Sequence, residues 1–162
     1  MKTAIYPGTF DPITLGHIDV IKKSLKIFDR VVVATTDNIN KNYFFSIDER
    51  LSIIKNSLFK DLKLNKKKIM VIPFDSLTID LCKKYKSMVI IRGLRAVSDF
   101  EYEFQLAGMN KKLNPNIETI FLMSDIENQI ISSKFVKEIS KLNGNINKFV
   151  TKSTAKILKN KF

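Results

Sequence analysis

The sequence predicts an α/β fold in which helices cover both faces of an open, doubly wound parallel sheet of five strands. Five short apolar runs are rich in Val and Ile and continuous rather than alternating, which is typical of parallel strands buried on both faces. Segments of helical periodicity lie between these runs, as the crossovers of a parallel sheet require. No linker, repeat or low-complexity segment divides the chain, so one domain is expected over residues 1–162.

The strands are expected at the apolar runs, residues 3–6, 30–36, 68–74, 87–93 and 117–123. The loops at their carboxyl ends are expected at residues 7–14, 36–45, 74–77, 92–98 and 124–131. In an open parallel sheet, ligands bind outside the carboxyl ends of the strands, where the strand order reverses. Every unusual local sequence of this chain falls in one of these loops, which indicates one site.

The helices follow the strands in turn. The first is expected after Gly16, where apolar side chains recur at helical spacing. The second begins at Ser46, and Glu49 three residues later completes a capping box. Further helices are expected over "LTIDLCKKY", over residues 99–113 and 132–142, and over residues 151–161.

Composition argues against secreted and membrane classes. The single cysteine, Cys82, excludes an internal disulfide framework and is typical of a reducing cytosol. Its place among helical apolar positions favours a buried structural thiol. No apolar run approaches the roughly 20 residues of a membrane span, and the first residues lack the pattern of a signal peptide. A cytoplasmic protein without a membrane partner is expected.

The net charge of +12 suggests nucleic-acid binding, because Lys and Arg neutralise phosphates. However, 24 of the 28 basic residues are Lys, spread along the chain among 13 Asn. A basic nucleic-acid-binding module would gather them on one face with interleaved aromatic residues, whereas the phenylalanines here sit mainly in apolar helix and strand positions. No nucleic-acid partner is expected.

The stretch "YPGTFDPITLGH", residues 6–17, holds two of the four prolines, two of the five glycines and the only histidine. Gly8 follows the first strand, where a missing side chain lets backbone N–H groups approach an anion, and Thr9 adds a hydroxyl donor. Gly16 and His17 open the first helix, whose N-terminus favours negative charge. An imidazole there can donate to phosphate oxygens that gather charge in a transition state. The alternative is a tight turn followed by a capping histidine.

The pattern Thr14-x-Gly16-His17 resembles the T/HxGH signature of the nucleotidyltransferase superfamily, in which the final histidine contacts the phosphates of the nucleotide. The resemblance implies a Rossmann-like sheet. Class I aminoacyl-tRNA synthetases carry a related motif, but 162 residues leave no room for a synthetase catalytic domain and a tRNA-binding domain.

Two of the four arginines stand together at a strand end, Arg92 and Arg95, with Gly93 between them. In a chain that otherwise uses Lys for charge, this pair suggests bidentate recognition of phosphate. The alternative is an internal ion pair with Asp99 or Glu101, which could explain either arginine but not both.

"RGLRAVSDFEYE" resembles the most diagnostic segment of the bacterial phosphopantetheine adenylyltransferase family, as do "YPGTFDPITLGH", "FLMS" and "ISSKFVKE". The resemblance extends from residue 3 to about residue 149. It implies transfer of AMP from ATP to 4′-phosphopantetheine by direct attack, without a covalent intermediate. It also implies Mg²⁺ accompanying ATP, no metal site of the protein's own, and a homohexamer.

The resemblance also implies the site residues. The implied catalytic residues are His17, Lys41 and Arg92. The implied contacts of phosphopantetheine are Thr9, Lys41, Thr78 and Arg92. The implied contacts of ATP are Thr9, Phe10, His17, Gly93, Leu94, Arg95, Glu103, Asn128, Gln129, Ile130, Ile131, Ser132, Ser133 and Lys134.

The sequence departs from the family pattern in two loops. The loop of Lys41 reads "DNINKNYFF" and lacks the usual prolines and second basic residue. The serine loop ends in Lys134 instead of a third Ser or a Thr, and "DIENQ" before it lacks the usual lysine and aromatic residue. An enzyme of the same fold acting on another acceptor, such as nicotinate mononucleotide, is the alternative function. The "RGLR" and "DFEYE" segments argue against it.

Overall fold

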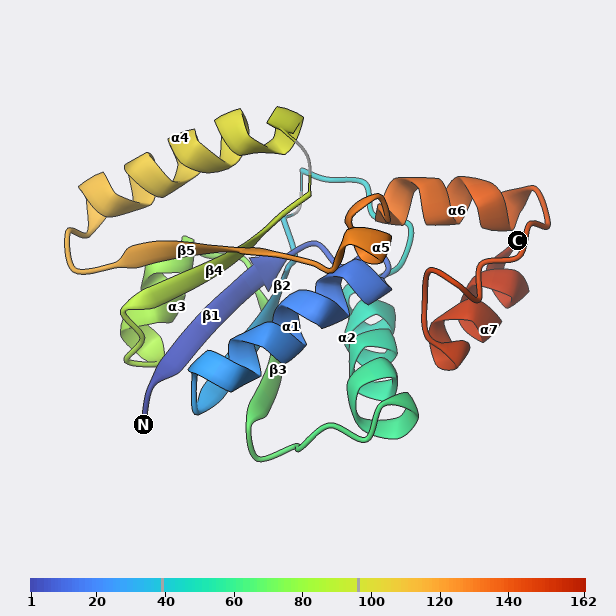
Figure 1. The fold of residues 1–162 in the computed structure, drawn as a ribbon, viewed down its shortest axis with the longest axis horizontal. Helices are drawn as coiled ribbons and strands as arrows, with labels where there is room; N and C mark the ends of the chain where they lie inside the picture. Colours follow the sequence, from blue (N-terminus) through green and yellow to red (C-terminus); the bar gives the residue numbers. More distant parts are fainter. Residues whose placement is uncertain (39, 96) are drawn as a thin grey trace.

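The computed structural model describes residues 1–38, 40–95 and 97–162. Ile39 and Ala96, which fall in the loops expected after the second and fourth strands, lie outside the described residues. One sheet with parallel pairing throughout runs in the order β3-β2-β1-β4-β5 (Figure 1). Its strands are β1 (Thr3–Gly8), β2 (Arg30–Thr36), β3 (Ile69–Phe74), β4 (Val89–Leu94) and β5 (Glu118–Met123).

Helices cover both faces of this sheet. Figure 1 shows α1 and α2 in front of the sheet and α3 behind it. The helical segments are α1 (Leu15–Ile27), α2 (Ile47–Lys55), the π-helical η1 (Asn56–Asp61), α3 (Thr78–Lys84), α4 (Val97–Leu113), α5 (Ile126–Gln129), α6 (Ser133–Lys141) and α7 (Lys152–Lys161).

Alternate residues of the central strands point to opposite faces, and both faces are packed. Tyr6 of β1 belongs to the cluster that α1, α2, α6 and α7 complete. Its neighbour Ile5 packs instead with Ile79 and Leu81 of α3. This two-sided burial is why the strands read as continuous apolar runs. The predicted α/β fold with a five-stranded, doubly wound parallel sheet is confirmed.

Two helical segments depart from the sequence expectation. Helix α5 lies within the loop expected at residues 124–131, where Asp19 of α1 accepts a hydrogen bond of 2.6 Å from Asn128 Nδ2. Segment η1 continues α2, and Asp61 at its end accepts hydrogen bonds from the N–H and hydroxyl of Ser153. Both depend on contacts with distant parts of the chain, which local periodicity does not record.

Two smaller expectations are confirmed. Ser46 N donates to Glu49 Oε2 at 2.8 Å and Ser46 Oγ accepts from Glu49 N at 3.3 Å, which is the predicted capping box. Cys82 is free and buried, and burial raises the pKa of its thiol to about 11. In the part of the chain that the structure describes, no helix has the length and apolarity needed to cross a membrane.

Candidate active site

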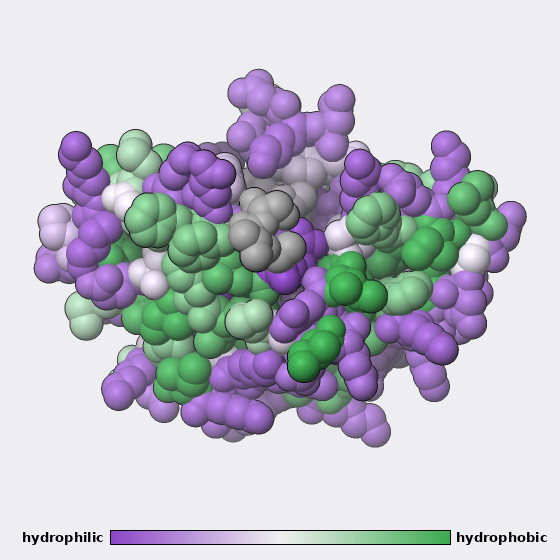
Figure 2. Space-filling model, turned by 45° about the horizontal axis from the view of Figure 1, so that its top comes forward, coloured by the Kyte–Doolittle hydropathy of each residue, from purple (hydrophilic) through white to green (hydrophobic). Residues whose placement is uncertain are grey.

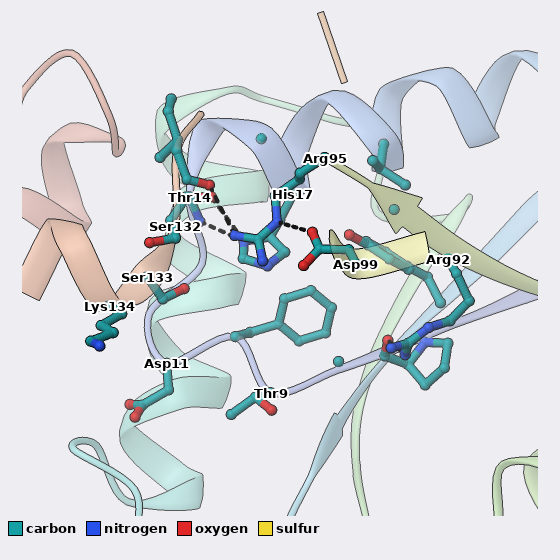
Figure 3. Close-up of a pocket in the computed structure, with 18 of the residues that line it drawn as sticks. Thr9, Asp11, Thr14, His17, Arg92, Arg95, Asp99, Ser132, Ser133 and Lys134 are labelled. Carbon is teal, nitrogen blue, oxygen red and sulfur yellow. Dashed lines mark hydrogen bonds and ion pairs between the residues drawn. The ribbon is translucent and has the colours of Figure 1, made fainter. Parts of the chain in front are cut away.

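The carboxyl ends of β1 and β4 open into a pocket of about 900 Å³, where the strand order reverses. This is where ligands bind in open parallel sheets, and the pocket lies at the sheet edge where the sequence predicts the site. Figure 3 shows Ser132 and Ser133 on one side of this space and Arg92 on the other, with His17 between them. The predicted residues that line the pocket are Thr9, Phe10, His17, Lys41, Arg92, Gly93, Leu94, Arg95, Glu103, Ile131, Ser132, Ser133 and Lys134.

The loop after β1 is shaped by Phe10, whose backbone has a positive φ of 47°. Its ring is buried and packs edge-on against the rings of Tyr6 and His17, at centroid distances of 5.3 and 5.1 Å. A Cβ on Gly8 would lie 2.7 Å from Phe10 Cζ. Gly8 is therefore required because the aromatic ring fills the space that a Cβ would take. Gly8 itself lines the pocket, and the approach of its backbone N–H to an anion stays a prediction.

His17 is held by the residue that caps its helix. Thr14 N lies 3.1 Å and Thr14 Oγ1 lies 2.9 Å from His17 Nδ1. A backbone N–H can only donate, so Nδ1 accepts and the proton of the neutral ring sits on Nε2. Burial, with repulsion from Arg95 and Arg92, lowers the pKa of His17 to about 4. The ring is consequently a neutral Nε2–H donor at pH 7.

Gly16 lets a second segment reach the start of α1. A Cβ at this position would lie 3.0 Å from the carbonyl oxygen of Asn128, so only glycine fits without displacing the backbone there. The pattern Thr14-x-Gly16-His17 therefore combines a cap, a backbone contact and an oriented imidazole. The capping histidine of the alternative reading is present, and the same cap orients the ring for a ligand.

Both arginines at the end of β4 are paired with carboxylates of α4. Nε and Nη2 of Arg92 donate to the two oxygens of Glu103 at 2.7 and 2.6 Å, and Nη1 donates to Pro7 O at 2.9 Å. Arg95 Nε donates to Asp99 Oδ2 at 3.2 Å. The expectation that an internal ion pair explains at most one arginine is wrong. Asp99 and Glu103 are one helical turn apart, so the same face of α4 meets both arginines.

Helix α6 closes the opposite side of the pocket. Ser132 caps it by accepting a hydrogen bond of 3.1 Å from Phe135 N. Ser133 Oγ donates to Pro12 O at 2.7 Å, which ties the start of α6 to the loop after β1. The free N–H groups of a helix start favour anions, and here they stand beside Lys134 and Lys137.

Four predicted residues do not line this pocket: Thr78, Asn128, Gln129 and Ile130. Asn128 turns its amide to Asp19, and Gln129 Nε2 donates to Ser124 O at 3.2 Å. Ile130 is exposed. The short helix α5 thus presents its side chains to α1 and to solvent, whereas Ser124 before it and residues 131–134 after it reach the pocket.

Other pocket residues were not predicted from the sequence. Asp99 and Tyr102 precede the predicted Glu103 by four and one residues on α4, and Lys137 follows Ser133 by four. Residues four apart on a helix lie on the same face, so Asp99 and Lys137 could have been predicted from Glu103 and Ser133. Asp11 gives no such signal, because its partners lie more than 30 residues away.

The carboxylates of the pocket are all occupied by partners within the chain. Asp11 accepts from two backbone N–H groups and Lys137, Asp99 from Arg95, and Glu103 from Arg92. Within the described residues, no group of three or more His, Cys, Asp or Glu could hold a metal ion. Mg²⁺ is commonly bound by one or two carboxylates together with substrate phosphates. Each carboxylate that lines this pocket already has a partner, so a magnesium ion here would have to be held mainly by the phosphates of a nucleotide.

Comparisons with known proteins show which family and which proteins this chain resembles. Residues 5–139 match the family described as Cytidylyltransferase-like. The chain is 71% identical to the phosphopantetheine adenylyltransferase of Pelagibacter ubique, covering 99% of this chain and 98% of that one. It is 48% identical to that of Sphingopyxis alaskensis, covering 96% and 90%. The solved Plasmodium falciparum nicotinic acid mononucleotide adenylyltransferase has a TM-score of 0.70 at 18% identity, covering 99% and 96%, a likeness of fold alone.

Proposed function

The chain belongs to the phosphopantetheine adenylyltransferase family of cytidylyltransferase-like proteins, and on that premise we propose that it transfers the adenylyl group of ATP to 4′-phosphopantetheine. The products are dephospho-coenzyme A and pyrophosphate, so the reaction serves coenzyme A synthesis. The observation that carries this function is the 71% identity over nearly the full length of both chains.

The reaction brings two anions together. An oxygen of the phosphopantetheine phosphate attacks the α-phosphorus of ATP, and the bond from that phosphorus to the departing pyrophosphate breaks with its electron pair. No covalent enzyme intermediate is needed. The protein must therefore position both phosphates in line and stabilise the charge that grows on the oxygens around phosphorus.

His17 stabilises that charge. Its Nε2–H donates to a phosphate oxygen in the transition state, and the hydrogen bond from Thr14 N keeps the ring oriented throughout. A neutral ring gives up no proton in this role. His17 therefore acts as a hydrogen-bond donor to the developing negative charge and not as a general acid.

Lys41, Arg92 and Thr9 meet the phosphopantetheine phosphate. A guanidinium has five N–H donors, and Arg92 uses three of them on Glu103 and Pro7, so two remain for a phosphate. Glu103 thus fixes the plane of the guanidinium before the acceptor binds. Lys41 is exposed and adds a charge from the loop after β2.

ATP occupies the side of the pocket formed by α4 and α6. Arg95, Gly93 and Leu94 bind it at the end of β4, and Ile131, Ser132, Ser133 and Lys134 bind it around the start of α6. Glu103 meets its adenosine portion, and Phe10 meets it through the backbone because its ring is buried. Mg²⁺ enters on the phosphates of ATP.

Thr78 contacts the pantetheine arm. Helix α3 begins at Thr78, and a smaller hollow of about 580 Å³ lies nearby at the ends of β2 and β3. This hollow is lined by Thr36, Asp37, Asn38, Asp75 and Ser76, which offer polar partners for an amide-rich arm.

The enzyme works as a homohexamer in the cytoplasm. Apolar side chains gather on the left of the face shown in Figure 2, over α4 and the edge strand β5. The exposed apolar side chains of α4 and β5 include Phe100, Tyr102, Phe104, Met109, Leu113 and Met123. Exposed apolar side chains gathered at one edge of the fold support burial against further copies of the chain. The free, buried thiol of Cys82 supports a reducing compartment. Sedimentation of the wild-type protein and of Phe104→Glu tests the assembly, and only the variant should sediment as a smaller species.

Pyrophosphate release tests the reaction itself. The purified protein is incubated with MgATP and either 4′-phosphopantetheine or nicotinate mononucleotide. Release with phosphopantetheine alone is expected. Release with nicotinate mononucleotide alone would assign the chain to the alternative acceptor.

A further inference from the structure

The loop between β2 and α2 carries Lys41, and the structure describes all of it except Ile39. We refer to residues 37–38 and 40–45 as the Lys41 loop. Lys41 itself is exposed, and it is held through its backbone N–H, which donates to Asn38 O at 3.0 Å. What directs this loop toward the pocket must therefore lie at its two ends.

Arg50 holds the beginning of the Lys41 loop. Its side chain is fully buried, and Nη1 donates to Thr36 O at 2.7 Å and to Thr9 O at 3.1 Å. Nη2 donates to Asp37 Oδ1 at 3.4 Å, and the guanidinium lies 3.8 Å from the centre of the Tyr43 ring. One side chain of α2 thus joins the end of β2 to the loop after β1.

Asp11 holds the end of the Lys41 loop. Its two oxygens accept from Phe44 N at 2.8 Å and from Phe45 N at 2.9 Å, and the residue is only 6% exposed. Lys137 Nζ donates to the same carboxylate at 3.2 Å, which brings α6 into the arrangement. A charged acceptor that receives two backbone N–H groups is a strong and geometrically restrictive contact.

We infer that Asp11 and Arg50 are positioning residues that hold the two ends of the Lys41 loop so that Lys41 faces the acceptor phosphate. Both reach the loop after β1, which carries Thr9, so they fix the distance between two groups that meet the same phosphate. Burying a charge costs free energy unless it is paired and hydrogen-bonded, and here the partners of the buried Arg50 and Asp11 include backbone groups at both ends of the loop. This inference rests on the role proposed above for Lys41.

The test compares Asp11→Asn with Asp61→Asn. An Asn offers one oxygen where Asp offers two, so Asp11→Asn leaves one of the two N–H groups without its acceptor. Asp61 is a matched control, because its two oxygens also accept from a backbone N–H and a second donor, both of Ser153 and far from the pocket. Arg50→Lys provides a second test, since one ammonium cannot reach Thr9, Thr36 and Asp37 together.

Steady-state rates of pyrophosphate release are measured for each folded variant, alone and combined with Lys41→Ala. Asp11→Asn is expected to raise the KM for phosphopantetheine about tenfold, the scale of one lost hydrogen bond to a charged group. The KM for ATP should change less than about twofold, and Asp61→Asn should change neither. In the Lys41→Ala background, Asp11→Asn should have almost no further effect, because both act through the same group. Amide exchange of the Lys41 loop should be faster in Asp11→Asn and unchanged in Asp61→Asn.

Four results would overturn the inference. An unchanged KM for phosphopantetheine in both Asp11→Asn and Arg50→Lys would show that the ends of the loop do not position Lys41. Additive effects of Asp11→Asn and Lys41→Ala would show that Asp11 acts independently, and a raised Mg²⁺ requirement would make it a metal ligand. If Lys41→Ala itself has no effect while wild-type activity is normal, the role proposed for Lys41 fails and the inference with it.

Discussion

The two sides of the pocket place the proposed catalytic groups, His17 and Lys41, in different ways. On one side, His17 is oriented by Thr14, three residues away, and both belong to the start of one helix. On the other side, the placement we infer for Lys41 depends on Asp11, which lies 33 residues from its partner Phe44, and on Arg50, which also reaches Thr9 across 41 residues of sequence. The difference teaches which parts of a site a local motif can specify. A capped helix start fixes its own side chains, whereas a loop needs distant partners.

The largest effect is expected on the locally fixed side. His17→Ala should lower kcat by about 10²–10³-fold, the range for loss of one oxyanion-type donor. The affinity for ATP should change much less, because ground-state binding uses several other groups. Steady-state kinetics and direct ATP binding separate the two quantities. Weaker ATP binding with an unchanged kcat would leave His17 as a binding or capping residue only.

Replacement of Arg92 should have a large effect of a different kind. Arg92→Ala should raise the KM for phosphopantetheine about 10–100-fold, since hydrogen bonds to charged groups are worth about 1.5–3 kcal/mol. It should also lower the free energy of unfolding by about 3–5 kcal/mol, because Glu103 is left buried without its partner. Kinetics and denaturant unfolding measure the two effects.

Arg95→Ala is the comparison for Arg92. It should mainly impair the use of ATP, and it should cost less than about 1 kcal/mol of stability, because the Arg95–Asp99 pair is partly exposed. Lys should not fully restore either arginine if the contacts with phosphate are bidentate. Full rescue by Lys at position 92 would reduce Arg92 to a point charge.

Replacement of the exposed Lys41 should have a smaller effect on activity. Lys41→Ala should raise the KM for phosphopantetheine about tenfold, since one charged hydrogen bond of about 1.5 kcal/mol is lost without disturbing any buried contact. Lys22→Ala is the control, because Lys22 is also exposed but lies along α1 and does not line the pocket. Equal activities of the two variants would remove Lys41 from the site.

The same comparison explains what the sequence could predict. The strands were predictable because burial on both faces leaves continuous apolar runs, and the Ser46 capping box because Glu49 lies three residues away. The family resemblance added Lys41 and Arg92. Asp11 and Arg50 escaped prediction because a charged residue beside a loop shows nothing in sequence of the backbone groups it will meet. The pairing of Arg92 with Glu103 was missed for the same reason, since it joins a strand to a helix.

The smallest expected effect concerns how the free energy of unfolding depends on pH. The pKa of His17 is lowered from 6.5 to about 4 in the native protein, chiefly by burial. Between these two values the unfolded chain binds a proton that the native chain does not, so the free energy of unfolding should fall as pH drops from about 6.5 toward 4. His17→Gln should remove that part of the slope. Urea unfolding of both proteins at a series of pH values measures it, and parallel curves would contradict a lowered pKa.

The protonation state of His17 tests the central claim most directly, because the ring must be a neutral Nε2–H donor for the proposed chemistry. His17 is the only histidine, so nitrogen NMR of histidine-labelled protein reports this ring without assignment. The expected result is a neutral Nε2–H tautomer at pH 7 that gains a proton only near pH 4. A ring that is protonated on Nδ1 when neutral, or that titrates near its ordinary value of about 6.5, would contradict the account.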